Sequence, residues 1–132
     1  MCTMLIVTRS SVASAALSAR MASVSSRMSA YRARLAVVAM TEFGRRLEEN
    51  VNGGADHGSA AFMFALGGAV QGGQMYGQWP GLKANDLREG DLRVTTDYRR
   101  VVQEILTKRR GETTPVKVFP SLNYQPLGFI NA

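Results

Sequence analysis

The sequence predicts an α/β fold whose strands are of the kind found in a parallel sheet, and three features carry this prediction. Two short runs, Leu35–Met40 and Ala60–Leu66, are continuously apolar. Such runs are typical of strands that are covered on both faces. The third feature is a set of apolar residues at helical spacing near the end of the chain, which indicates a helix with one buried stripe: Tyr98, Val101, Val102, Ile105 and Leu106.

Length and charge set limits on the class of protein. The 132 residues, of which 45% are hydrophobic, suffice for one ordinary domain. The formal net charge is +6, but residues 1–41 hold five arginines and no acidic residue, so the rest of the chain is nearly neutral. A basic groove with interleaved aromatic residues, which a nucleic-acid-binding protein needs, is not visible there. We therefore expect no nucleic-acid partner.

Residues 1–34 form a segment rich in Ser, Ala, Met and Arg, which we separate from the region 35–132. Its apolar residues recur at spacings of three and four and would line one face of an N-terminal helix. Either a targeting or partner-binding helix, or a helix packed against a sheet, explains this pattern, and we favour the second. No apolar run reaches the roughly 18 residues of a transmembrane helix. The stripe consists of Leu17, Met21, Val24, Met28, Tyr31 and Leu35.

The first apolar run ends in a group of charged residues. Glu42 is followed by Gly44 and by two arginines, Arg45 and Arg46. In open α/β sheets, ligands bind where strands end at their carboxyl side. Guanidinium groups pair bidentately with oxyanions, which makes Arg45 and Arg46 candidate anion-binding residues. Glu48 and Glu49 fit a solvated helical turn or a loop.

A turn-rich stretch, residues 50–58, contains the only histidine, His57, next to Asp56. An imidazole beside a carboxylate suits a divalent cation such as zinc or calcium if further ligands converge on it. A single histidine in a turn is also commonly an ordinary surface residue. Cys2 is the only cysteine, so neither a disulfide nor a cysteine-type zinc site can form within one chain.

The C-terminal part contains a well-delimited helix followed by an irregular tail. Residues 95–97 offer N-cap side chains, and Gly111 fits the C-terminal end. The basic cluster at residues 108–110 is explained by the helix dipole. Beyond it, the apolar residues need a surface that so short a chain does not obviously supply: Leu122, Tyr124, Leu127, Phe129 and Ile130.

Several ordered motifs together resemble the C-terminal end of a family of secreted bacterial proteins, the domain of unknown function 1501 family (DUF1501). That family is similar to the alkaline phosphatase and sulfatase superfamily. The resemblance covers about residues 35–127, and the motifs that carry it are TEFGRRLEEN, NGGADHG, ALGGAVQGGQMYGQWPGL, DLRVTTDYRRVVQEIL and VFP.

The resemblance implies a partial alkaline-phosphatase-like parallel sheet and a metal-dependent hydrolase of phosphate or sulfate esters. It would place Glu42 and His57 among the metal ligands, with Asp56 beside them. Phe43 departs from the pattern, because it stands where the superfamily usually has a ligating histidine. The resemblance also implies export, although the chain shows no signal peptide.

The superfamily's nucleophile and several metal-binding carboxylates lie upstream of this region. We therefore expect a fragment that has no catalytic residue of its own, is inactive alone, and depends on a missing N-terminal half or another chain. The alternative is a non-catalytic binding or structural module that associates with a partner chain.

Overall fold

The structure is a computed structural model and describes residues 4–8, 31 and 33–132. Most strands form one four-stranded sheet in the order β2-β5-β1-β6, and β3 and β4 form a separate two-stranded hairpin. The elements in chain order are β1 (Met4–Thr8), β2 (Ala36–Ala39), β3 (Gly44–Glu49), β4 (Ala55–Gly58), β5 (Phe62–Gly67), β6 (Gln74–Tyr76), the 3-10 helix η1 (Ala84–Asp86), α2 (Tyr98–Arg110) and α3 (Pro115–Val118).

The α/β class is confirmed, but the sheet differs from the parallel sheet that we expected. Only the central pair, β1 and β5, runs parallel, whereas β2 pairs with β5 and β6 pairs with β1 in antiparallel directions. The chain leaves β2, makes the β3–β4 hairpin and returns directly into β5. A connection without a crossover helix favours an antiparallel neighbour.

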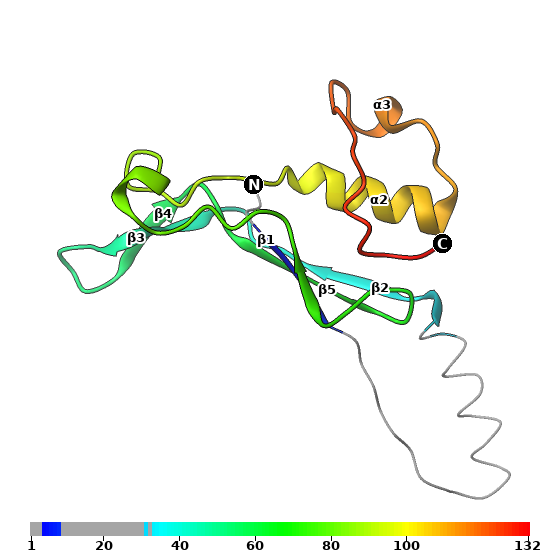
Figure 1. Ribbon diagram of the computed structural model, residues 1–132, viewed down its shortest axis with the longest axis horizontal. Helices are drawn as coiled ribbons and strands as arrows, with labels where there is room; N and C mark the ends of the chain where they lie inside the picture. Colours follow the sequence, from blue (N-terminus) through cyan, green and yellow to red (C-terminus); the bar gives the residue numbers. More distant parts are fainter. Residues whose placement is uncertain (1–3, 9–30, 32) are drawn as a thin grey trace, which may run out of the picture.

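Helix α2 covers one face of the sheet, which we call the inner face (Figure 1). Met63 and Ala65 of β5 point to this face and are buried against Val101 of α2. Phe129 and Ile130 complete the same core. The inner face is thus sealed by one helix and by the end of the chain.

Helix α2 begins and ends where the sequence indicates. Asp97 is the N-cap, and its side chain accepts a hydrogen bond from the backbone N–H of Arg99. Gly111 adopts the left-handed conformation at the C-terminal end (φ 69°), which a residue without a Cβ reaches at little cost. Hydrogen bonding from the Arg99 guanidinium lowers the pKa of the Asp97 carboxyl.

The tail is part of the core, which corrects our expectation that its apolar residues lack a surface. Figure 1 shows it passing α2 and returning to the sheet. Glu104, buried in α2, accepts hydrogen bonds from the backbone N–H groups of Leu127 and Phe129. Burial raises the pKa of Tyr124, and the nearby charge of Glu104 adds to the rise. No sequence pattern had marked Glu104 as the residue that fixes the tail.

The expected N-terminal helix over residues 1–34 lies mostly outside the described residues. Its last turn is described: Tyr31, Ala33 and Arg34 are helical, and Leu35 N–H donates a hydrogen bond to the Tyr31 carbonyl over 3.0 Å. In the described part of the chain, no helix has the length and apolar character needed to cross a membrane.

Candidate functional site

A cavity of about 650 Å³ lies where β2 leads into the hairpin, and the segment that the sequence singled out forms one wall of it. Glu42 and Arg45 contribute to that wall. Ligand pockets in proteins have volumes of this order, and their walls are mostly apolar with a few polar groups. The lining residues are Thr41, Glu42, Phe43, Gly44, Arg45, Ala60, Ala61, Phe62, Phe64 and Leu92.

The close approach of two backbones holds this wall in place. Gly44 is buried at the start of β3, and a Cβ added there would lie 1.6 Å from the carbonyl oxygen of Ala60. Only glycine therefore fits, because backbone atoms cannot move aside as a flexible side chain can. Just before it, the Thr41 hydroxyl donates a hydrogen bond to the Phe43 carbonyl over 2.8 Å and stabilises the turn out of β2.

Phe43 brings His57 to the edge of the cavity. The two rings are stacked, with centroids 3.8 Å apart and planes inclined by 28°. The guanidinium carbon of Arg45 lies 5.4 Å from the centroid of the Phe43 ring, and Arg45 is also in register with His57 across the hairpin. The Phe43 ring thus contacts both a histidine and an arginine at the edge of the cavity.

The two candidate anion-binding arginines have different surroundings, since successive residues of a strand point to opposite faces. Arg46 is engaged: its guanidinium donates to the Glu89 carbonyl and forms an ion pair of 3.6 Å with Asp91. Arg45 donates one hydrogen bond, to the Ala55 carbonyl, and lines the cavity. Arg45 is therefore the better placed of the two to bind an anion in the cavity.

The three predicted metal ligands are brought to the same part of the molecule without forming a complete ligand set. Glu42 lines the cavity, and His57 stacks on Phe43. Asp56 is adjacent to His57 in β4, and its carboxylate accepts a hydrogen bond from the Asn50 side chain over 2.9 Å. Residues 4–8, 31 and 33–132 contain no group of three or more His, Cys, Asp or Glu side chains that could hold a metal ion. These residues alone do not fit a bound zinc or calcium ion, and their role as ligands stays a prediction.

Sequence reasoning did not identify two parts of this site. Phe62 and Phe64 form part of the apolar wall of the cavity. Because side chains alternate along a strand, the sequence could have indicated that these two share one face of β5, opposite Met63 and Ala65. Asp91 holds the hairpin in place by pairing with Arg46 and by accepting a hydrogen bond from Ser59, and both partners are distant from it in the chain. The expectation of a helical turn or loop at Glu48 and Glu49 was wrong, because both belong to β3.

Comparison with known proteins matches the chain to a family. Neither the curated proteins nor the solved structures contain a match to this chain. The sequence profile of a family of proteins of unknown function, DUF1501, matches residues 15–117, which is well over half of the chain. The resemblance seen in the motifs is therefore confirmed, and the chain belongs to the DUF1501 family.

Proposed function

We propose that this chain carries the substrate-binding pocket of a hydrolase-like protein that acts on phosphate or sulfate esters, and that it is inactive alone. The observation that carries the proposal is the cavity lined by Glu42, Arg45 and apolar side chains. In this proposal the Arg45 guanidinium binds the ester oxyanion, because it presents parallel N–H donors that match such oxygens. The apolar wall takes up the alcohol part of the ester.

The proposal assigns bond cleavage to groups outside this chain. No described cluster of ligands could hold the divalent metal ions of the superfamily, so no step is assigned to a metal here. An alkaline-phosphatase-like parallel sheet, extended beyond the β1–β5 pair by strands of another chain or segment, is part of the same proposal. Glu42 and His57 would then meet further ligands at the edge of the cavity.

The test is an NMR titration of the whole chain with 4-nitrophenyl phosphate and with 4-nitrophenyl sulfate, which measures the affinity for each ester. Arg45→Ala is expected to weaken binding about tenfold or more, as loss of a hydrogen bond to a charged group costs about 1.5–3 kcal/mol. Arg45→Lys should retain part of the affinity, because the charge stays but the bidentate geometry is lost. Arg88→Ala is the matched control, since Arg88 is exposed and does not line the cavity.

Two results would refute the proposal. One is affinity that does not change in Arg45→Ala. The other is turnover of either ester by the purified chain without metal or partner. Inorganic phosphate is expected to bind more weakly than the aromatic esters, because it leaves the Phe62 and Phe64 wall unused.

A second candidate function, association with a partner chain, is favoured by the β3–β4 hairpin. The hairpin extends away from the sheet (Figure 1), and it carries exposed apolar side chains at Leu47 and at Val51, which is fully exposed. A contiguous exposed apolar surface marks an interaction site, and we propose that these two side chains belong to one. Sedimentation velocity of the purified chain tests it: self-association that Val51→Asp abolishes supports this function, and a compact monomer at all concentrations counts against it.

A further inference from the structure

The cavity at the end of β2 carries two charges of opposite sign, and the proposed function uses only one of them. Its lining includes one arginine, Arg45, and one carboxylate, Glu42. The guanidinium suits the oxyanion of an ester, whereas a carboxylate in the same wall repels that anion. A cavity that served an anion alone would gain nothing from Glu42. The carboxylate therefore points to a second, positively charged group on the ligand.

The Glu42 carboxylate has no partner among the residues that the structure describes. It is exposed, and the ion pairs of the described chain join Arg46 to Asp91 and Arg99 to Asp97. Arg45 does not pair with it either, since the Arg45 guanidinium contacts the backbone carbonyl of Ala55 and the Phe43 ring instead. The charge of Glu42 is thus available to a cation that enters the cavity.

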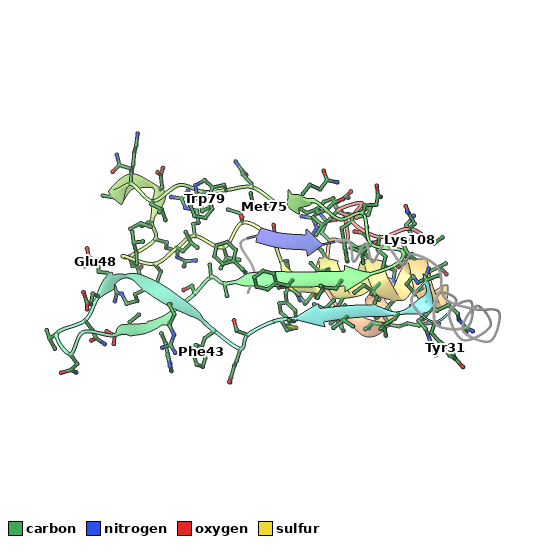
Figure 2. All side chains as sticks on the ribbon, turned by 90° about the horizontal axis from the view of Figure 1, so that it is seen from below. Tyr31, Phe43, Glu48, Met75, Trp79 and Lys108 are labelled. Atoms are coloured by element: carbon green, nitrogen blue, oxygen red, sulfur yellow. The ribbon has the colours of Figure 1, made fainter. Side chains whose placement is uncertain are left out.

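Three aromatic rings line the same cavity: Phe43, Phe62 and Phe64. Figure 2 shows Phe43 where β2 leads into the hairpin. The guanidinium of Arg45 already lies over its ring, with 5.4 Å between the guanidinium carbon and the ring centroid. Phe62 and Phe64 are 40% and 44% exposed, so a ligand can reach their rings. The face of an aromatic ring attracts cations, and quaternary ammonium groups in particular are bound between aromatic side chains.

The backbone holds Glu42 next to these rings by two fixed points. On one side of Glu42, β2 ends at Ala39, which is paired with Phe64 of β5. On the other side, Gly44 packs so closely on Ala60 that a Cβ would lie 1.6 Å from the Ala60 carbonyl oxygen. The short segment that carries Glu42 is therefore attached at both ends to β5 and to the residues just before it. This placement does not depend on the flexible part of the hairpin tip.

We propose that Glu42 and the rings of Phe62 and Phe64 form a binding subsite for an ammonium group. The ester bound by this cavity then has an alcohol part that carries a quaternary ammonium group. This identification of the alcohol rests on the proposed function, because it takes the oxyanion to be bound by Arg45. Each charge of such a ligand meets an opposite charge in the wall, which offsets the cost of removing it from water. A cavity of about 650 Å³ has room for both groups.

The test compares two esters that differ in the charge at one atom. Phosphocholine carries a trimethylammonium group, and 3,3-dimethylbutyl phosphate has the same shape with carbon in place of the nitrogen; the two corresponding sulfates form a second pair. NMR titration of the whole chain, in buffer freed of divalent cations, measures the affinities. The ammonium ester is expected to bind about fivefold more tightly than its uncharged isostere. The net charge of +6 would by itself favour the more negative isostere, so this preference would have a local cause.

Two variants locate the subsite. Glu42→Gln retains the shape of the side chain without its charge, and should reduce the preference to less than about twofold without weakening the binding of the isostere. Phe64→Leu retains apolar bulk without the aromatic ring, and should reduce the preference about twofold. Glu48→Gln is the matched control, because Glu48 is exposed, lies further along the hairpin (Figure 2) and does not line the cavity. The control should leave the preference unchanged.

The outcomes separate this inference from the function on which it rests. Equal affinity for the ammonium ester and its isostere in the parent chain, or a preference that persists in Glu42→Gln, would overturn the ammonium subsite and leave the ester function standing. If no ester binds but tetramethylammonium binds and Glu42→Gln abolishes this binding, the ester function is refuted and the subsite is supported. If neither the esters nor tetramethylammonium bind, both are refuted. The comparison in the parent chain decides the matter even if a variant does not fold.

Discussion

The two faces of the four-stranded sheet both carry apolar side chains but have different surroundings. Along β5, Met63 and Ala65 are each 1% exposed, whereas their neighbours Phe62 and Phe64 are about 40% exposed. The inner face is sealed by α2 and by the returning tail. The opposite face, which we call the outer face, stays partly exposed in the part of the chain that the structure describes. The continuous apolar run therefore predicts the strand, but it does not predict which face of the strand is buried.

This difference is tested most strongly by replacing Phe129 of the tail, which packs on the inner face, and Phe64 of β5, which lies on the outer face. Phe129→Ala removes a fully buried ring that packs edge-on against Tyr76, with centroids 6.2 Å apart, and is expected to lower the free energy of unfolding by about 4 kcal/mol. Phe64→Ala, on the outer face, should cost about 1–2 kcal/mol because its ring is already partly hydrated. Urea denaturation measures both. Equal costs would show that the two faces are equally closed.

The attachment of the tail to α2 is the next largest effect. Glu104→Gln retains the shape of the side chain but replaces one acceptor oxygen with an N–H₂ group facing a backbone N–H, of Leu127 or Phe129. The free energy of unfolding should fall by about 2 kcal/mol, since a buried donor is left unsatisfied.

Glu49→Gln is the control for this change, because Glu49 is exposed in the hairpin and its replacement should alter stability by less than about 0.5 kcal/mol. A loss of stability in Glu104→Gln no larger than in the control would mean that the tail is held by its apolar residues alone.

These two faces also show how much of the fold the sequence could predict. Both strands, β2 and β5, and helix α2 with its caps were predicted from local patterns, since each is determined by residues close together in the chain. Strand direction was wrong because it depends on the connection through the β3–β4 hairpin. The burial of Phe129 could not be predicted, because it depends on a hydrogen bond to Glu104, which is 25 residues away in the chain.

The candidate site was predicted in outline and not in detail. The position of Glu42 and Arg45 at the end of β2 follows from the rule that ligands bind at strand ends, and the cavity lies there. The distinction between Arg45 and Arg46 depends on Asp91 and Glu89, which lie more than 40 residues further along the chain. The role of Phe43 as a platform for His57 depends on the fold of the hairpin, which no single motif specifies.

A smaller effect is expected from the cap of the helix that covers the inner face. Asp97→Ala removes the acceptor for the Arg99 backbone N–H and should cost about 1 kcal/mol at pH 7. Arg99 lowers the pKa of the folded Asp97 carboxyl below its unfolded value, so this contribution is present above the unfolded pKa and is lost as the pH falls below about 4. Urea denaturation of both proteins at pH 7 and pH 3 checks this, and a difference that does not shrink at pH 3 would contradict it.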